Sequence, residues 1–347
     1  MIEDILQFTN DFIKANAASS QENLQSILKF SNISYLELDD FFTTINEKAC
    51  INLHFHPDRL SKDGLVIESL LKSGVYKNQY QTNTSSGSLS AIMGGDRDNW
   101  ENELFGNIFR NKDIDTRPKY GALNLTLTAD GASPRFGSCY FVTRPEVKNR
   151  STFTYGDSHL LPKLRGTINN FHQLLLGLFE DVFVRNFALG RHYESVTDFF
   201  FSVTKNLETN VAKPSISHNL DFYIEAQIHG TISLTDDISD VVVDYSYKGT
   251  SYETYFEAIA SRHHINLQWN TGVQLLEDNF PNNFRGNEIP AFVKHIADNG
   301  KVNAYILGKS IADKNGPNKY SDVELFQLYK YVWHCLVKFG KPMVTGM

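Results

Sequence analysis

The sequence predicts an α+β fold, because strand-like and helical stretches are grouped along the chain instead of alternating regularly. Strand-like patterns dominate 47–158 and 215–250, and a helical pattern at 159–214 separates them. Helical periodicity also covers 1–46 and most of 251–347. We therefore expect one α+β core with a helical insertion, an N-terminal helical segment and a C-terminal helical region.

The first predicted strand follows the N-terminal helices. Apolar residues three and four positions apart within 1–46 predict two or three short helices. From 51 to 56 the chain alternates as a strand does, and Pro57 ends it because proline cannot donate to a strand ladder. A helix predicted at 63–73 closes on Gly74, a residue that suits a helix C-terminus.

The remaining elements follow the same two periodicities. A polar strand-like stretch at 80–90 precedes a helix that begins at Gly94-Gly95. Leucine and phenylalanine side chains along one face predict helix from 161 to about 213, and 252–339 is mainly helical in its pattern. Further strands are predicted at 120–128, 137–143, 151–155, 222–229 and 241–244.

Composition and charge exclude several classes of protein. The 347 residues are 41% hydrophobic and 13% aromatic, which excludes a disordered or low-complexity chain. The 33 basic and 40 acidic side chains give a net charge of −7 without a basic cluster, so we expect no general nucleic-acid binding. The three cysteines lie far apart, which is typical of a reducing compartment and leaves no zinc-type pair.

Charge and hydropathy also bear on location. The N-terminus is acidic where a signal peptide would be basic, and no apolar run approaches the roughly 20 residues that cross a bilayer. We therefore expect a protein that is made in the cytoplasm and has no membrane partner. Secretion or translocation without a cleavable signal peptide stays open.

The segment His54-Phe55-His56-Pro57-Asp58-Arg59 is the first candidate site. His54 and His56 lie two positions apart on a strand, so both imidazoles point to one face. One interpretation is a metal-dependent hydrolase, which would need further ligands on the later strands of a regular βα barrel. The later histidines fall mostly in predicted helices or loops. A ribose-binding strand and a histidine pair with a purely structural role are the other two interpretations.

The second candidate site is the strand that carries Glu225. Glu225 and Gln227 share one face, and a glycine-containing turn, a short acidic helix and another strand follow. A single glutamate on a strand ordinarily faces solvent. Thr152 and Thr154 share a face of an earlier strand, where hydroxyl pairs usually join neighbouring strands. We weigh that structural role equally against the positioning of a ligand.

Six motifs, in order, resemble an uncharacterised bacterial domain family over roughly 51–250. They are HFHPDR, GGDR-x-x-WE, RPKYGALN, RFGSCYF, TFT-x-GDS and EAQ-x-HG. Beyond that family, the arrangement resembles the ADP-ribosyltransferase superfamily. HFHPDR resembles the His-Gly-x-Arg of its poly-ADP-ribose-polymerase-like branch, with His56 and Arg59 at the His and Arg positions. Glu225 to Asp244 resembles the segment that begins at the catalytic glutamate.

This resemblance implies a split β-sheet core and an NAD-dependent transferase that attaches ADP-ribose to an acceptor protein and releases nicotinamide, as bacterial effectors and toxins do. Glu225 would be catalytic, because a carboxylate stabilises an oxocarbenium-like ribose. The helical insertion and the C-terminal region would recognise the acceptor, and no resident metal is implied. The implied NAD contacts are His56 or His54 at a ribose, Arg59 at the pyrophosphate, Tyr120 or Tyr155 stacked on nicotinamide, and Thr152 and Thr154 in the middle motif.

Two departures from the superfamily pattern matter. Pro57 replaces a glycine whose backbone contacts the nicotinamide amide, and proline has no N–H to donate. Tyr223 stands where arginine-modifying members carry an acid or a glutamine, so the acceptor residue type stays open. The alternatives to the transferase are therefore a catalytically inactive binding module and the metal-dependent hydrolase built on His54 and His56.

Overall fold

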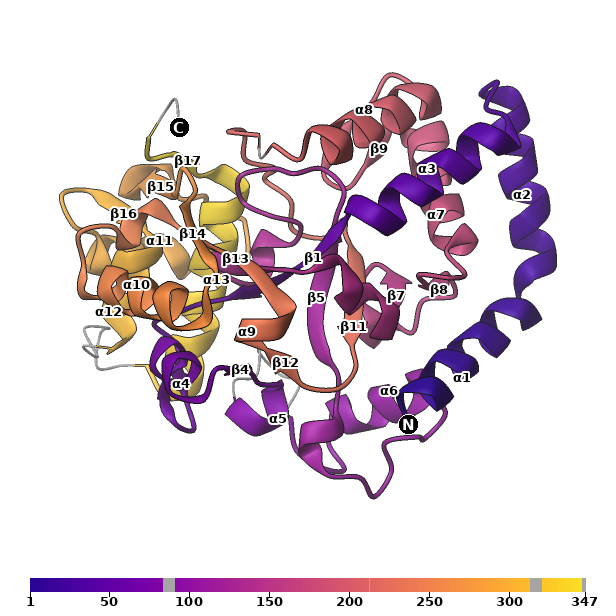
Figure 1. Ribbon diagram of the computed structural model, residues 1–347. Coiled ribbons are helices and arrows are strands. Elements are labelled where there is room, and N and C mark those ends of the chain that lie inside the picture. The colour runs from indigo at the N-terminus through magenta and orange to yellow at the C-terminus, as the bar shows by residue number, and fades with distance from the viewer. Residues whose placement is uncertain (84–90, 212, 313–319, 345–347) are drawn as a thin grey trace.

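A central eight-stranded sheet organises the chain, and helices surround it (Figure 1). The computed structural model describes residues 1–83, 91–211, 213–312 and 320–344. The strand order is β14-β13-β6-β1-β5-β11-β7-β8, and every neighbouring pair is antiparallel except β13 and β14. The α+β class is therefore confirmed. The strands are β1 (Cys50–Phe55), β5 (Lys119–Asn124), β6 (Cys139–Thr143), β7 (Ser151–Tyr155), β8 (Arg165–Thr167), β11 (Ile224–Ile228), β13 (Ile238–Val243) and β14 (Asn266–Trp269).

Strand β1 changes its pairing partner along its length. Residues 50–52 pair with β5, whereas 52–55 pair with β6 on the other side. Strand β5 uses 119–122 to pair with β11 instead. β1 and β5 therefore pair only over residues 50–52 of β1 and then run apart, as their ribbons show in Figure 1. The sheet stays hydrogen-bonded from edge to edge but opens between β1 and β5.

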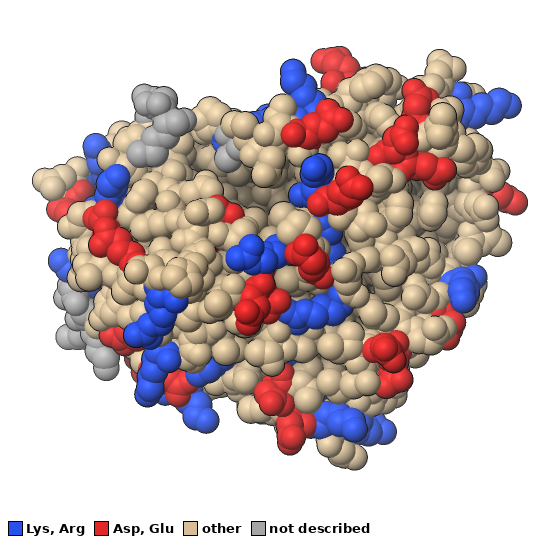
Figure 2. Space-filling model, in the orientation of Figure 1, with Lys and Arg blue, Asp and Glu red and all other residues tan. Residues whose placement is uncertain are grey.

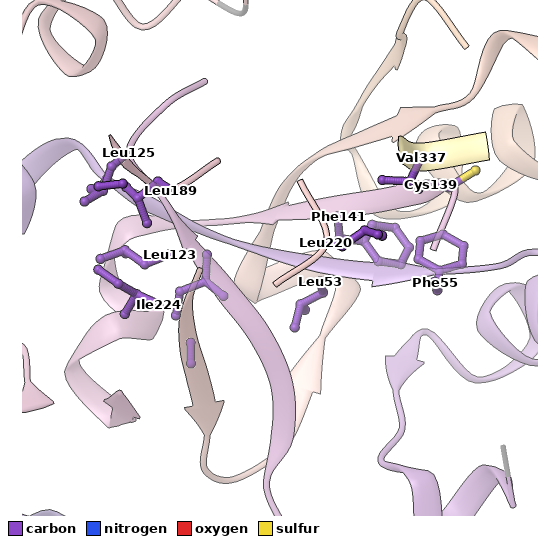
Figure 3. Close-up of a cluster of buried hydrophobic side chains, with 14 of the residues drawn as sticks. Leu53, Phe55, Leu123, Leu125, Cys139, Phe141, Leu189, Leu220, Ile224 and Val337 are labelled. Carbon is purple, nitrogen blue, oxygen red and sulfur yellow. The ribbon is translucent and has the colours of Figure 1, made fainter. Parts of the chain in front are cut away.

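Apolar side chains pack on both halves of the sheet. Phe55 of β1 and Phe141 of β6 stack with ring centroids 4.9 Å apart (Figure 3). On the other half, Leu123 of β5 and Ile224 of β11 are buried in the same cluster. Burial of such side chains contributes about 1.5–3 kcal/mol each, so this cluster anchors the strands that carry the motifs.

Helices from the N-terminal segment and from 159–214 lie together on one side of the sheet (Figure 1). Phe41 stacks on Phe200 at 4.5 Å and joins α3 to α8. Ser34 and Glu37 form a capping box that sets the start of α3. These helices are α1 (Ile2–Ala15), α2 (Ala17–Phe30), α3 (Tyr35–Lys48), α7 (His172–Arg185) and α8 (Val196–Thr209).

The C-terminal region lies on the opposite side (Figure 1). It contains four helices and a small sheet of order β16-β15-β17 among its described residues. Helix α13 is the longest of the four, and the indole N–H of its Trp333 donates to the carbonyl of Pro134 at 2.8 Å. The elements are α10 (Ser251–His263), β15 (Val273–Leu276), α11 (Ile289–Ile296), β16 (Lys301–Asn303), α12 (Ala304–Ala312), α13 (Asp322–Phe339) and β17 (Lys341–Pro342).

Short elements connect these layers. The helices among them are α4 (Val66–Ser73), α5 (Gln79–Thr82), α6 (Asp96–Leu104) and α9 (Leu234–Asp237). The short strand pairs are β2 (Leu60–Ser61) with β3 (Gly64–Leu65), β4 (Val75–Tyr76) with β12 (Ile232–Ser233), and β9 (Phe187–Ala188) with β10 (Arg191–His192). No helix in the described ranges is long and apolar enough to cross a membrane.

Three predicted features differ from the structure. Strand β8 joins the central sheet from within the expected helical insertion, and β14 joins it from within the expected helical tail. Residues 80–82 belong to helix α5 where a strand was expected at 80–90, and 84–90 of that stretch lie outside the described residues. Strands of three or four residues leave too short an alternation to stand out from neighbouring helices, which is why periodicity missed β8 and β14.

Candidate functional site

A cavity of about 370 Å³ opens where β1 and β5 diverge. Its lining includes residues from all six motifs and from α13, which follows every motif in sequence. Segments far apart in the chain therefore meet around one space. The lining residues on which the site depends are His54, His56, Arg59, Arg97, Trp100, Tyr120, Arg135, Asp157, Glu225, Lys330 and His334.

His54 is held by both of its ring nitrogens. Its Nε2 accepts from the backbone N–H of Ser133 at 3.2 Å, so Nδ1 carries the proton and donates to the carbonyl of Gly137 at 3.1 Å. A Cβ on Gly137 would lie 2.4 Å from the backbone of Phe55, so only glycine allows this approach. Burial lowers the pKa of His54 to about 4. His54 is therefore a neutral, fixed wall of the cavity.

His56 lies just beyond the end of β1 and packs edge-on against two aromatic rings of α13. Its ring centroid is 5.0 Å from that of Tyr329 and 5.1 Å from that of Trp333. Its Nδ1 lies 3.4 Å from the hydroxyl of Ser138. Burial lowers the pKa of His56 well below its ordinary value, so this imidazole is neutral at pH 7.

Buried tyrosines fix the turn that follows His56. The carboxylate of Asp58 accepts from Tyr247 at 2.7 Å and from Tyr329 at 3.0 Å, and burial raises the pKa of Asp58 to about 6. The carbonyl of Pro57 accepts from the backbone N–H of Ile67 at 3.1 Å. Neither residue lines the cavity, so Asp58 is an anchor of the turn and the Pro57 carbonyl is already engaged in starting α4.

Arg59 is the cation of the HFHPDR motif that reaches the cavity. Its guanidinium carbon lies 3.8 Å from the ring centroid of Phe326 on α13. Burial lowers its pKa to about 10, which leaves it charged at neutral pH. A planar guanidinium over an aromatic ring is held in orientation and still presents N–H donors to an anion.

Glu225 faces the cavity from β11 and is 6% exposed. Gln227, two positions along the strand, donates its Nε2–H to the Glu225 carboxylate at 3.0 Å. Burial, and then the nearby charge of Asp157, raises the pKa of Glu225 to about 8. Glu225 is therefore protonated at neutral pH in the free protein.

Thr152 and Thr154 lie behind Glu225 and do not line the cavity. Thr152 donates to Gln227 Oε1 at 3.0 Å, and Gln227 donates to Thr154 Oγ1 at 3.0 Å. The two hydroxyls thus hold the glutamine that contacts Glu225. They were expected among the NAD contacts, and the structure places them outside the cavity lining, because β7 pairs with β11 on the side away from β5.

Tyr155 and Tyr120 have different positions. The hydroxyl of Tyr155 donates to Asp181 of α7, and its ring is not in the cavity lining, so it cannot stack on a ligand there. Tyr120 lines the cavity, and its hydroxyl donates to Glu101 at 2.8 Å. Trp100 packs edge-on against the Tyr120 ring at 5.7 Å. Of the two tyrosines considered for stacking, the structure places only Tyr120 at the site.

A buried ion cluster orients Tyr120. Glu101 accepts from Arg117 at 3.1 Å as well as from Tyr120, and Arg117 also pairs with Asp98. Asp98 in turn accepts from the backbone N–H of Gly94 at 2.8 Å. The GGDR-x-x-WE and RPKYGALN motifs therefore meet in one network, which sets the position of one wall of the cavity.

Positive charge exceeds negative charge around the cavity. Among the described lining residues six are cationic and two acidic, Asp157 and Glu225. The outer face drawn in Figure 2 instead shows acidic side chains beside basic ones, in a chain whose net charge is −7. The cavity is therefore suited to an anion. The cations are Arg59, Lys77, Arg97, Lys119, Arg135 and Lys330.

The geometry bears on a metal at the histidine pair. Within the described residues, no group of three or more His, Cys, Asp or Glu side chains is arranged to hold a metal ion. Both nitrogens of His54 are also engaged in backbone hydrogen bonds. The hydrolase interpretation required further metal ligands beside His54 and His56, and no such group of ligands occurs among the described residues.

Sequence reasoning missed the contribution of α13. Tyr329, Lys330, Trp333 and His334 all reach the cavity from this helix. Their spacing of three and four positions places them on one helix face, which was visible in the sequence. No local sequence pattern showed that this helix face packs against the HFHPDR turn. From the sequence, the C-terminal region was instead expected to recognise the acceptor.

One comparison with known proteins matches a stretch of the chain that includes both the six motifs and α13. A search of curated proteins finds no match to the chain. The family described as "Protein of unknown function (DUF3626)" matches residues 50–339. The match starts where the resemblance was expected to start but continues beyond 250, through α13, so the helix belongs to the same unit as the motifs. The chain belongs to the DUF3626 family.

Proposed function

We propose that the protein is an NAD-dependent ADP-ribosyltransferase that modifies an acceptor protein. The observation that carries this proposal is the meeting of Glu225, His56, Arg59 and Tyr120 around one cavity with an excess of cations. These are the residues that the superfamily resemblance assigned to the ribosyl cation, a ribose, the pyrophosphate and nicotinamide. Each type of side chain suits the part of NAD it would contact.

The order of strands supports the proposal. Strands β1, β5 and β11 are adjacent, so the HFHPDR motif, Tyr120 and Glu225 come from three neighbouring strands. The expected middle motif at 151–154 lies one strand further out. β5 therefore takes the middle place of the site, with Tyr120 and Gly121 lining the cavity. The divergence of β1 from β5 is also what a split-sheet core of this type requires.

The chemistry requires little from the protein besides electrostatics. The bond between the ribose C1 and the nicotinamide nitrogen breaks, its electron pair leaves with neutral nicotinamide, and positive charge develops on the ribose. The Glu225 carboxylate would stabilise that charge. An acceptor nucleophile then forms a bond to C1 and loses a proton. Because cationic nicotinamide favours an ionised neighbour, bound NAD would lower the pKa of Glu225 from about 8.

Pro57 changes how nicotinamide would be held. Proline has no N–H, and Pro57 does not line the cavity, so the backbone contact of the superfamily would be lost. The ring would instead lie against Tyr120, which Glu101 and Trp100 hold in place. Stacking of this kind is directional and contributes about 0.5–1.5 kcal/mol beyond buried area.

Incubation of the protein with NAD labelled in the ADP-ribose part, together with a cell lysate, tests the proposal. We expect a labelled protein band and release of nicotinamide in equal amounts. Nicotinamide without a band would replace the transferase by an NAD glycohydrolase. If neither a labelled band nor free nicotinamide forms, both activities are rejected and a binding module remains. NAD binding measured by calorimetry would then identify that module.

A further inference from the structure

The side of the cavity formed by α13 carries positive charge that the described protein does not neutralise. Lys330 is half-buried and lines the cavity. No hydrogen bond or ion pair to its ammonium group occurs within residues 1–83, 91–211, 213–312 and 320–344. A half-buried cation loses hydration without regaining it from a partner, which is unfavourable unless a ligand supplies the missing anion.

Other cationic side chains surround Lys330. Burial lowers its pKa, and the charges of Arg135, Arg285 and Arg59 lower it further. Arg135 and Arg59 also line the cavity, and Arg135 pairs at 2.7 Å with Asp221, whose side chain is 56% exposed. Asp157 also lines the cavity and opposes these cations, because its charge raises the pKa of Lys330. The lining side chains of this wall still carry more positive than negative charge.

His334 lies one turn beyond Lys330 on the same helix. It also lines the cavity and is 1% exposed, and its Nδ1 has no hydrogen-bond partner within the part of the chain that the structure describes. Burial and the charges of Arg285, Arg135 and Lys330 lower its pKa to about 2, so the ring is neutral. This buried ring nitrogen, on the same helix face as the ammonium group of Lys330, adds a polar group that a ligand atom could satisfy.

We propose that Lys330 and Arg135, with Arg59 and His334, form a binding site for the diphosphate of a nucleotide. The diphosphate carries two negative charges and several acceptor oxygens, which match ammonium and guanidinium donors. The identification of that ligand as NAD rests on the proposed function. The anion site itself rests on charge and burial, and it assigns α13 to nucleotide binding, whereas the sequence assigned the tail to the acceptor.

Calorimetric titration of the full chain with inorganic pyrophosphate and with ADP-ribose tests this site. We expect Lys330→Gln to weaken binding of both by roughly 10- to 100-fold, because hydrogen bonds to charged groups have about that effect. Lys338→Gln is the matched control, since Lys338 lies on the same helix, is exposed and does not line the cavity. It should bind both ligands as the parent does. If Lys330→Gln does not fold, Arg135→Gln is measured in its place.

The outcomes separate this site from the proposed activity. A parent protein that binds neither pyrophosphate nor ADP-ribose overturns the site, and so does a Lys330→Gln variant that binds both as tightly as the parent. Loss of binding in the variant supports the site even if the parent transfers no ADP-ribose, in which case the transferase alone is wrong. A Lys330→Gln variant could transfer ADP-ribose at the parent rate and bind pyrophosphate and ADP-ribose with the parent's affinity. That result would support the transferase and reject the diphosphate site.

Discussion

Gln227 donates a hydrogen bond of 3.0 Å to the carboxylate of Glu225 from the same face of β11. The glutamine is itself held by Thr152 and Thr154 of the neighbouring strand. Glu225 thus has a fixed orientation within a low-dielectric wall. The orientation of Glu225 therefore depends on Gln227, which does not line the cavity, and this dependence leads to the first prediction.

Gln227→Met should lower kcat by about tenfold and move the rise of activity to higher pH. The lost N–H bonded to the charged form of Glu225, so its removal raises the pKa of that carboxyl further. A hydrogen bond to a charged group contributes about 1.5–3 kcal/mol. Gln268→Met on the exposed edge of β14 is the control. An unchanged pH profile for Gln227→Met would show that the glutamine does not tune Glu225.

Glu225→Gln should retain NAD binding and lose turnover by on the order of 10² to 10³, because the carboxylate is needed chiefly in the transition state. Initial rates of nicotinamide release and calorimetry with NAD measure the two effects separately. The variant keeps the shape of the side chain, so folding should be preserved. Parent-like turnover in a folded Glu225→Gln protein would remove this residue from the catalytic site.

The pH dependence of kcat/KM should rise through about pH 8, where Glu225 ionises in the free protein. Asp157→Asn should move that rise to lower pH, because the charge of Asp157 helps to raise the pKa of Glu225. Asp278→Asn, at an exposed carboxylate, is the control and should keep the parent profile. A profile that is flat between pH 6 and 9 would show that Glu225 does not limit the reaction.

Glu225→Gln should also be more thermally stable than the parent at pH 8.5, with a smaller difference at pH 5. The folded pKa of about 8 lies above the ordinary value of 4.5, so folding retains a proton that the unfolded chain releases. The contribution of that carboxyl to stability is fully present below about pH 4.5 and is lost as the pH rises through 8. Thermal unfolding of both proteins at the two pH values measures the difference; equal melting temperatures at pH 8.5 would contradict it.

Arg117→Ala should destabilise the fold by about 3–5 kcal/mol, because it leaves the carboxylates of Glu101 and Asp98 without their main cation. Urea unfolding measures the free-energy change. Arg110→Ala, at an exposed arginine nearby in sequence, should stay within about 0.5 kcal/mol of the parent. A similarly small change for Arg117→Ala would mean that the ion cluster does not support the Tyr120 wall.

Local sequence patterns were sufficient for some features of the molecule. Alternation over 51–56 and the proline that follows predicted β1, which the structure places at Cys50–Phe55. The strand that carries Glu225 was predicted at 222–229 and is β11, Ile224–Ile228. In both cases the pattern is local, because the side chains of a strand alternate between a buried and a site-facing surface.

Which strands are neighbours was decided by tertiary structure alone. Thr152 and Thr154 have the residue types and spacing of a ligand-facing pair, yet β7 lies outside β11 and the two hydroxyls support Gln227. Tyr120 and Tyr155 are equivalent in the sequence, but only β5 lies between β1 and β11. Strand order depends on contacts between residues far apart in the chain, which no local periodicity records.

The charge states of the site were decided in the same way. The sequence alone predicted that Glu225 stands on a strand, that a strand carries His54, and that 252–339 is mainly helical. Only the folded chain buries Glu225 beside Asp157 and brings Lys330 of α13 to a cavity that begins at β1. The pKa of Glu225 and the lack of a partner for Lys330 depend on the side chains packed around them in the described structure. Those side chains come from distant parts of the chain, so only the tertiary structure brings them together.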